Sequence, residues 1–472
     1  MILSPRIASI QLRDLSPRQL SMTAEKREAR IIVTPTRPFV ITESAWTLHA
    51  NLTANIQKHL AQYMPSVPES IILEKIANAK VALNTEQQKA IFLSCRTPCS
   101  ILNGGPGTGK STTLATMAAA IKTYEPHRRI VVAAFSARIA ETTATKCNAE
   151  PQTLHALTGI KPGATDKMET RKETLDESIG TIIIDEAFSA EPVLLAALFA
   201  LATPRQRIIL AGDPAQILPI GDGRALHDLM RTNIIPSTTL RHGHRLAKSP
   251  HLAEQIERIK AGKEPFAGPG LNIRHEKIMK SSHRHQIKVR CAIEIHTHQT
   301  QSGIDHTIIT QNRVGDCGYH TINRQITRRD KPDVGDRIIT TQKWPLKNRD
   351  WDSTANRWHN GSCGQITDRN EKDIQILFDN GDLVTAPAET SCLEFTHAIS
   401  GHRAQGLEYQ AATLLIDKTS AQALNRQYLV SALSRAPHMT IITDPGLLKM
   451  AAAKDGLTER CPTIPAVKSS LT

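Results

Sequence analysis

The sequence predicts an α/β protein in which parallel sheets are covered by helices on both faces. Short apolar segments rich in β-branched residues alternate with helical stretches, at 100–103, 130–134, 181–184 and 207–211. Each segment is apolar along its whole length, which indicates a strand buried on both faces of a parallel sheet. A glycine-rich loop follows the first segment and opens a helical run at 112–121, and this order is typical of α/β folds.

The chain of 472 residues is long enough for about three folding units of ~100–200 residues. Its β-branched residues predict a strand at 30–41, and the spacing of apolar residues predicts an amphipathic helix at 44–63. This region contains no residues that suggest chemistry. We predict an N-terminal α+β region at 1–80, a first α/β domain at 81–239, a second at 240–333 and 393–460, an insert at 334–392 and a tail at 461–472. The chain is expected to be disordered from about residue 455.

The insert differs from the rest because its predicted strands are short, at 336–340, 364–367, 374–378 and 383–386. Asn360-Gly361 and Asn380-Gly381 lie between them. Asn-Gly is a strong hairpin-turn signal, since both residues tolerate a positive φ angle. The pattern predicts a small β-barrel.

Charge favours a polyanionic partner. Lys and Arg outnumber Asp and Glu by 58 to 45, a formal net charge of +13. Aromatic residues make up only 4% of the chain, so contacts to backbone phosphates are a better expectation than a surface of stacking rings.

The longest apolar run, 193–202, is far shorter than the ~20 residues of a transmembrane helix, so no membrane partner is expected. Eight cysteines are scattered without a C-x-x-C pair, as in proteins with reduced thiols, and we expect a cytoplasmic location. Residues 1–21 lack the apolar core of a signal peptide. An organelle transit segment stays open as the alternative.

The glycine-rich loop predicts a site for ATP phosphates. Its glycines let backbone N–H groups and a helix N-terminus surround the phosphate oxygens. Lys110 is placed to reach the β- and γ-phosphates, and Ser111 to hold Mg²⁺. The predicted nucleotide-binding residues of this loop are Gly104, Gly105, Pro106, Gly107, Thr108, Gly109, Lys110, Ser111 and Thr112.

Polar residues follow two other buried strands. Asp185, at the end of one, is the second candidate Mg²⁺ ligand, and Glu186 beside it can deprotonate an attacking water. Gln216, after the strand that ends near Gly212, can sense the γ-phosphate. These residue types predict ATP hydrolysis.

In order and spacing, the motifs from residue 83 to about 443 resemble those of superfamily 1 helicases of the RecD-like, Dda-like branch. Besides the P-loop and Asp185-Glu186, the matching segments are 83–90, 134–140, 153–155, 212–223, 240–262, 310–312, 395–409 and 428–436. The chain departs from the usual residues at Phe135, Ala137, Phe188, Ile217-Leu218 and Arg403-Ala404.

The resemblance implies two RecA-like P-loop NTPase domains, an SH3-like barrel as the insert, and a strand-separating pin at 157–178. It implies that Gln87 reads adenine, that Glu408 also contacts the nucleotide, and that Arg245 and Arg435 are arginine fingers. The implied nucleic-acid contacts are Arg138, Thr153, His155, Asn312, His402 and Arg403. Fingers on the second domain would couple hydrolysis to domain closure.

The sequence thus predicts an ATP- and Mg²⁺-dependent DNA helicase or translocase acting on single-stranded DNA and duplex junctions. The resemblance implies 5′-to-3′ movement, protein partners such as a nuclease or recombination complex, and a role in repair, recombination, replication or transfer. An RNA helicase stays open, because backbone contacts distinguish the two polymers poorly. A nucleotide-switched, partner-dependent subunit, like the RecD-type α subunit of exonuclease V, also stays open.

Two weaker signals remain. Residues 274–298 are rich in Lys, Arg and His, which indicates a solvated basic face or, less favoured, a metal site for which no Cys or carboxylate completes a ligand set. Cys95 and Cys99 lie near the P-loop strand and are expected to be buried, inert thiols, with redox sensitivity as the alternative.

Overall fold

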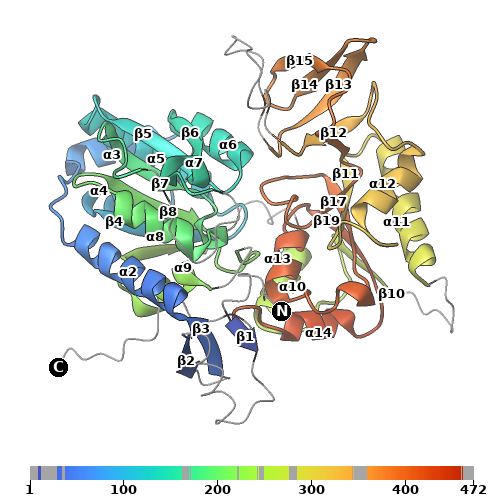
Figure 1. Cartoon of the computed structure of the whole chain (residues 1–472), viewed down its shortest axis with the longest axis horizontal. Helices are drawn as coiled ribbons and strands as arrows, with labels where there is room; N and C mark the ends of the chain where they lie inside the picture. Colours follow the sequence, from blue (N-terminus) through green and yellow to red (C-terminus); the bar gives the residue numbers. More distant parts are fainter. Residues whose placement is uncertain are drawn as a thin grey trace. The chain divides into compact units, whose positions relative to one another are not determined.

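The computed structural model describes residues 9–11, 29–33, 38–161, 170, 172–219, 223–241, 243, 249–275, 284–342, 344, 358, 360–458 and 460. The chain divides into two compact units, which are described separately (Figure 1). Unit 1 comprises Met1–His244 and Gly456–Thr472, and unit 2 comprises Arg245–Asp455. The insert predicted at 334–392 lies within unit 2.

Unit 1 is built on a six-stranded sheet with the order β6-β5-β7-β8-β4-β9, in which every pair is parallel. Its strands are β4 (Cys99–Gly104), β5 (Arg129–Ala134), β6 (Glu150–Thr153), β7 (Ile179–Ile184), β8 (Arg207–Gly212) and β9 (Ser237–Leu240). The four predicted strands are confirmed as β4, β5, β7 and β8. Sequence reasoning missed β6 and β9, which lie at the two edges and are more polar than the central strands.

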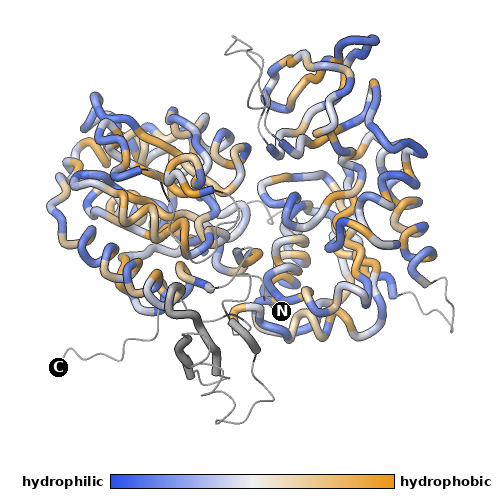
Figure 2. The backbone as a smooth tube through the Cα atoms, viewed as in Figure 1, coloured by the Kyte–Doolittle hydropathy of each residue, from blue (hydrophilic) through white to orange (hydrophobic). Residues whose placement is uncertain are grey.

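Alternating side chains of these strands enter two apolar cores, one on each face of the sheet. Ile182 and Ile184 join one core, and Ile183 joins the other. The first core is covered by α2 (Glu43–Leu60), α7 (Leu154–Thr158), α8 (Pro192–Leu201) and α9 (Ala225–Thr232). The second is covered by α3 (Glu69–Ala77), α4 (Thr85–Arg96), α5 (Lys110–Tyr124) and α6 (Ala137–Cys147). Figure 2 shows the resulting hydrophobic interior of the sheet.

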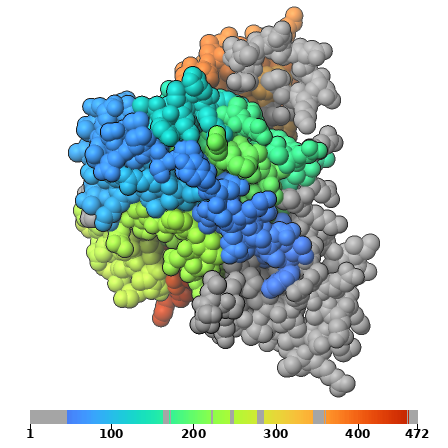
Figure 3. Space-filling model, turned by 90° about the vertical axis from the view of Figure 1, so that its left-hand side faces the viewer, coloured from blue at the N-terminus to red at the C-terminus, as the bar shows by residue number. Residues whose placement is uncertain are grey.

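Helix α8 explains the longest apolar run of the sequence, because nearly all of its side chains are buried in the first core. Its neighbour there is α2, which confirms the helix predicted at 44–63. Figure 3 shows the surface of the N-terminal described residues, in blue, lying against green residues of unit 1. Among the described residues no helix is both long and apolar enough to cross a membrane.

The single strand predicted at 30–41 is wrong. The structure has two antiparallel strands, β2 (Ala29–Val33) and β3 (Pro38–Thr42), and β1 (Ser9–Gln11) pairs with β3. In the sequence, Pro35 falls between β2 and β3, and Pro38 is the first residue of β3. Proline has no backbone N–H to donate to a neighbouring strand.

Unit 2 contains a five-stranded parallel sheet with the order β10-β19-β18-β11-β17. Its strands are β10 (Leu271–His275), β11 (His306–Thr310), β17 (Ala398–Ser400), β18 (Ala411–Leu415) and β19 (His438–Thr443). Helices α11 (Arg284–Gln301) and α12 (Tyr319–Thr327) pack on one face, and α10 (Pro250–Lys260) and α13 (Arg426–Leu433) lie on the other, beside α14 (Leu447–Ala453) (Figure 1).

The insert is an antiparallel sheet with the order β15-β14-β13-β12-β16. The four predicted strands are confirmed as β12 (Arg337–Thr340), β13 (Cys363–Arg369), β14 (Asp373–Phe378) and β15 (Leu383–Pro387), whereas β16 (Leu393–Phe395) was missed. Gly361 and Gly381 have φ angles of 87° and 91°, which favour glycine. Stacked Trp344 and Trp358, 5.4 Å apart, join the core of this sheet.

The expectation of disorder from about residue 455 is wrong for residues 456–458 and 460. Arg224 Nη1 donates to the Leu457 carbonyl at 2.6 Å, and Arg460 Nη2 donates to the Pro219 carbonyl at 2.6 Å. These bonds attach the segment to unit 1. Residue 459 and the predicted tail, 461–472, lie outside the described residues.

Candidate active site

The candidate active site lies at the carboxyl edge of the unit 1 sheet. Strands β4, β8 and β7 are neighbours and parallel, so the residues that follow them meet at the same edge. The P-loop follows β4, Asp213 to Gln216 follow β8, and Asp185 and Glu186 follow β7. This edge is where ligands bind in open α/β sheets.

The P-loop connects β4 to α5 through a tight turn. Gly109 is the N-cap of α5 and has a φ angle of 84°, which favours glycine. Thr108 Oγ1 donates to the Gly105 carbonyl at 2.9 Å, and Lys110 Nζ donates to the carbonyls of Gly104 at 2.5 Å and Gly105 at 3.4 Å. The ammonium group therefore lies over the loop, where the N-terminus of α5 favours anions. This arrangement fits a polyphosphate.

Gln87 connects this loop to α4. Its side chain forms a capping box with Asn84, and its Nε2 donates to the Thr108 carbonyl at 3.2 Å. A Cβ atom at Gly109 would lie 2.2 Å from this Nε2. The residue predicted to read adenine is thus 4% exposed and directly supports the shape of the P-loop.

Asp185 is 8% exposed, and both of its carboxylate oxygens accept hydrogen bonds. Oδ2 accepts from Thr143 Oγ1 at 2.6 Å, and Oδ1 accepts from the Glu186 backbone N–H at 2.9 Å. Glu186 itself has a φ angle of 52°, an unusual value for a residue with a side chain. Since each oxygen keeps lone pairs, Asp185 and Ser111 suit a Mg²⁺ ion.

Thr143 contacts the predicted metal ligand and was missed by sequence reasoning. It lies on α6, 3% exposed, and fixes the orientation of the predicted metal ligand. A threonine inside an amphipathic helix carries no local signal of such a role, because its partner lies 42 positions further along the chain.

Gln216 lies in the turn after β8. Its Nε2 is 3.4 Å from Asp213 Oδ2, and the Ala215 N–H donates to Asp213 Oδ1 at 2.9 Å. His227 supports this turn, because its Nε2 is 2.9 Å from the Pro214 carbonyl oxygen and its ring packs edge-on against Phe188. Phe188, which departs from the residue usual in superfamily 1 helicases, therefore packs against the histidine that supports the turn of Gln216.

The predicted nucleic-acid residues of unit 1 lie at the end of β6 or just after β5 and β6, at the same edge. Thr153 Oγ1 caps α7 by accepting from the Ala156 N–H at 3.1 Å. The His155 ring packs edge-on against Phe135, which is 38% exposed, and burial lowers the pKa of His155 below its usual value. Arg138 lies on α6, half-buried.

In unit 2 the structure brings together two of the matching segments, 395–409 and 428–436. Arg435 is 5% exposed; its Nε donates to the Ser431 carbonyl at 2.8 Å, and its Nη1 is 3.4 Å from the Ala404 carbonyl oxygen. Arg403 pairs with Glu394 and lies 5.1 Å from the Tyr319 ring centre. His402 and Glu408 are exposed, and Asn312 is half-buried. Arg245 lies outside the described residues.

The two weaker signals have different outcomes. Cys95 and Cys99 are buried free thiols, as expected, and burial raises the pKa of Cys95 to about 12. The prediction of a solvated face at 274–298 is wrong for Lys288 and His296, which are 0% and 3% exposed. The expectation that no Cys or carboxylate accompanies these histidines is also wrong, because folding places Cys317 and Asp417 beside His285.

A family model described as an AAA domain matches residues 82–283. The RecBCD enzyme subunit RecD of Mycobacterium tuberculosis is 26% identical over 396 residues, covering 74% of this chain and 67% of that protein. The ATP-dependent RecD2 DNA helicase of Deinococcus radiodurans is 24% identical over 366 residues. The match covers 76% of this chain and 48% of that protein.

Among solved structures, the Pif1 helicase from Bacteroides in complex with ADP-AlF3 and ssDNA has a TM-score of 0.54 at 16% identity, covering 79% of this chain and 94% of that one. The Pif1 helicase from Candida albicans has a TM-score of 0.51 at 16% identity. The match covers 80% of this chain and 98% of that one. These likenesses show a mixed α/β, Pif1-like helicase fold with parallel sheets. With the sequence relatives, they support the predicted resemblance to superfamily 1 helicases of the RecD-like and Pif1-like kind.

Proposed function

We propose that the chain is an ATP-dependent DNA helicase or translocase that moves along single-stranded DNA in the 5′-to-3′ direction. The observation that carries the proposal is the carboxyl edge of the unit 1 sheet, where a P-loop, an Asp-Glu pair and a glutamine follow three neighbouring strands. The sequence relatives named RecD and RecD2 DNA helicase support DNA as the polymer.

In this proposal the P-loop residues bind the phosphates of ATP, and Ser111 and Asp185 hold Mg²⁺, which would neutralise charge on the phosphate oxygens. Glu186 takes a proton from the attacking water as the bond to the γ-phosphorus forms and the bond to the β–γ bridging oxygen breaks. Lys110 stabilises the charge that develops on these oxygens, and Gln216 senses whether the γ-phosphate is present.

Arg435 and Arg245 act as arginine fingers on the second motor domain. A finger contributes only when it reaches the γ-phosphate, so hydrolysis would depend on domain closure. Arg435 is already oriented by bonds to two backbone carbonyls within unit 2, which reduces the entropy that it loses on reaching the nucleotide. Repeated closure and opening around one DNA strand would move the protein along it.

We propose that residues 81–239 form one RecA-like domain, that residues 240–333 and 393–460 form the other, and that 334–392 form an SH3-like insert. The pin is proposed at 157–178, of which 162–169 and 171 lie outside the described residues. Arg138, Thr153, His155, Asn312, His402 and Arg403 are the proposed contacts to the strand, and Gln87 and Glu408 complete the nucleotide site.

The decisive test is steady-state ATP hydrolysis with no polymer, with single-stranded DNA and with RNA of matched sequence, at several salt concentrations. We expect stimulation by DNA that weakens as salt rises, and no hydrolysis by the Lys110→Ala variant. Unwinding of duplexes with a 5′ or a 3′ tail then tests direction. Equal stimulation by RNA, or unwinding only from the 3′ tail, would contradict the polymer or the direction.

A partner-dependent motor subunit is the second candidate. It is favoured by the relatives named RecBCD enzyme subunit RecD and by the departures at Phe135, Ala137, Phe188 and Ala404. Such a subunit would bind ATP, yet DNA would not raise its turnover in the absence of its partner. Nucleotide binding measured beside turnover on the same sample separates the two candidates.

A further inference from the structure

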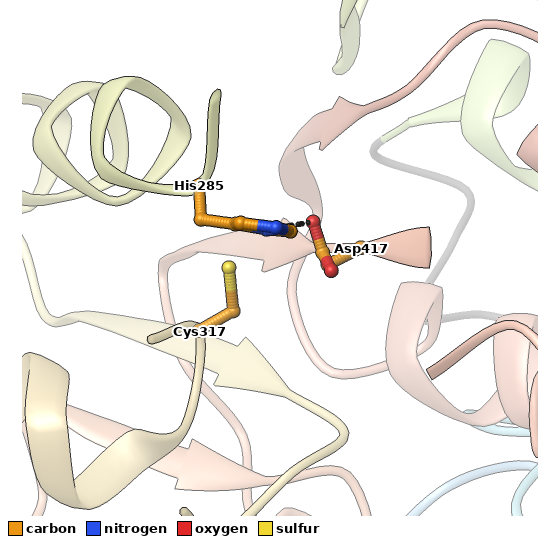
Figure 4. A group of neighbouring side chains, drawn as sticks. All are labelled: His285, Cys317 and Asp417. Carbon is orange, nitrogen blue, oxygen red and sulfur yellow. Dashed lines mark hydrogen bonds and ion pairs between the residues drawn. The ribbon is translucent and has the colours of Figure 1, made fainter. Parts of the chain in front are cut away.

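Three side chains with metal-binding atoms, none of which was given a role above, meet at the carboxyl edge of the unit 2 sheet. His285 lies near the start of α11, Cys317 lies in the loop after β11, and Asp417 follows β18 (Figure 4). One ligand atom of each residue, a ring nitrogen, the sulfur and a carboxylate oxygen, lies within 4.8 Å of the others. We propose that these three residues bind a transition-metal ion, with Zn²⁺ as the reference ion.

The donor set favours this class of ion. Imidazole, thiolate and carboxylate together are typical ligands of Zn²⁺, whereas Mg²⁺ and Ca²⁺ prefer oxygen alone. Bond lengths of about 2.0–2.3 Å place neighbouring ligand atoms about 3.5 Å apart around a tetrahedral ion. The three side chains therefore need only a small adjustment, and a water molecule would complete the tetrahedron.

Charge in the surrounding cluster favours an added cation. Asp417 and Asp444 are each 1% exposed, and both contact the ammonium group of Lys288, which is fully buried. Two carboxylates and one ammonium leave an excess negative charge when His285 is neutral. A divalent ion together with the Cys317 thiolate adds one positive charge and brings the cluster to neutrality, which lowers the cost of burial.

Lys288 does not prevent binding, because it has a second carboxylate partner. Its Nζ is 2.7 Å from Asp444 Oδ2, so that pair persists when an Asp417 oxygen turns towards the metal. Asp444 Oδ1 has no hydrogen-bond partner among the described residues and can accept a further contact from Lys288. His285, with its side chain 32% exposed, gives the ion a path from solvent.

Binding exchanges protons for the metal. His285 Nδ1 lies 2.7 Å from Asp417 Oδ2, and the ion would replace the proton between them while Nε2 carries the ring N–H. Cys317 would lose its thiol proton to solvent as the metal–sulfur bond forms. Burial raises the pKa of Cys317 to about 12, so this thiol stays protonated at neutral pH without a metal.

The test uses the full chain, stripped with a chelator and titrated with Co²⁺ in the absence of nucleotide. A thiolate bound to Co²⁺ gives a charge-transfer absorption band that histidine and carboxylate ligands do not give. We expect the band in the wild-type protein and in Cys291→Ser, a control that removes a half-buried thiol of α11. Cys317→Ser should abolish the band, and His285→Gln should weaken Co²⁺ and Zn²⁺ binding by about tenfold or more.

X-ray absorption at the zinc edge of the wild-type protein gives a second readout that needs no variant. We expect one sulfur and about three nitrogen or oxygen ligands for each Zn²⁺. A charge-transfer band that persists in Cys317→Ser, or a bound zinc without sulfur, would overturn the proposal. Neither readout uses ATP hydrolysis, so the outcome is independent of the proposed helicase function.

Discussion

The carboxyl edges of the two parallel sheets differ in how their polar groups are distributed along the chain. In unit 1 the groups come from short contiguous motifs, such as the P-loop and Asp185-Glu186. In unit 2 the central group is Lys288, whose partners Asp417 and Asp444 are 129 and 156 positions away. A contiguous motif is visible in the sequence, whereas a cluster assembled from distant elements is visible only after folding.

The interiors differ as well. Three histidines of unit 2 form a hydrogen-bonded chain, in which His296 Nδ1 is 2.9 Å from His306 Nδ1 and His296 Nε2 is 3.1 Å from His397 Nδ1. His306 Nε2 continues the chain to Thr413 Oγ1 at 3.0 Å. Unit 1 also buries histidines, His49 and His59, beside cores made mainly of isoleucine, leucine and alanine. The three linked histidines are expected to make the stability of unit 2 depend on pH.

The largest effect is expected at the unit 1 edge, from Lys110→Ala. The ammonium group donates to carbonyls of the loop, so we expect an unchanged fold and a loss of ATP turnover of at least about a hundredfold. Steady-state hydrolysis with DNA present measures the loss. Lys122→Ala, in the last turn of the same helix, is the control and should keep wild-type turnover. Residual activity above about a tenth would contradict the assigned role.

Lys288→Met tests the buried cluster of unit 2. The variant leaves two buried carboxylates without their shared cation, and removing one partner of a buried ion pair costs about 3–5 kcal/mol. Denaturant unfolding measures this loss, with Lys449→Met as a control because Lys449 is exposed on α14. A loss below about 1 kcal/mol would show that unit 2 does not depend on this ammonium group.

Acidification tests the histidine chain. Burial lowers the pKa of His296 to about 3 and that of His306 to about 4, with the neighbouring histidines also lowering the first. The unfolded chain binds these protons near pH 6.5, so the stability is complete above that pH and is lost as pH falls towards the folded values. Between pH 6.5 and 5 the unfolding free energy should fall by about 2 kcal/mol for His296 alone.

Thermal unfolding of wild-type protein, His296→Gln and His438→Gln across this pH range checks the expectation. His438 is exposed on β19, so the unfolding temperature of its variant should depend on pH as in the wild-type protein. The unfolding temperature of His296→Gln should depend less on pH. Part of this dependence will persist in every variant, because burial also lowers the pKa of His49 in unit 1 to about 4. If the unfolding temperatures of all three proteins depended on pH equally, the linked histidines would make no contribution to this dependence.

The smallest effect is expected from Thr143→Val, which removes the hydroxyl that donates to Asp185. We expect the Mg²⁺ concentration for half-maximal hydrolysis to rise about tenfold, because groups that orient a metal ligand influence affinity at about this level. Thr145→Val is the matched control, since Thr145 is exposed on the same helix and its hydroxyl donates to the Glu141 carbonyl at 2.9 Å. An equal response of the two variants would remove Thr143 from the site.

Much of the fold was predictable because its signals are local. The strands β4, β5, β7 and β8 are continuous apolar runs, and the predicted resemblance to superfamily 1 helicases is supported by the comparisons. The misses have physical reasons: β6 and β9 are short edge strands, and prolines divide the segment at 30–41. Thr143 was missed because its partner comes from a distant strand end.

Composition and the order of neighbouring residues were sufficient to predict the class of fold, the P-loop and the carboxylates of Asp185 and Glu186. Those features depend on residues close in the sequence and on the pairing of strands. Tertiary packing alone decided that Lys288 and His296 are buried, and that His285 meets Cys317 and Asp417. The free energy of a charged or titratable side chain depends on which groups surround it. Those groups come from α11, the loop after β11 and the end of β18, which only the folded sheet brings together.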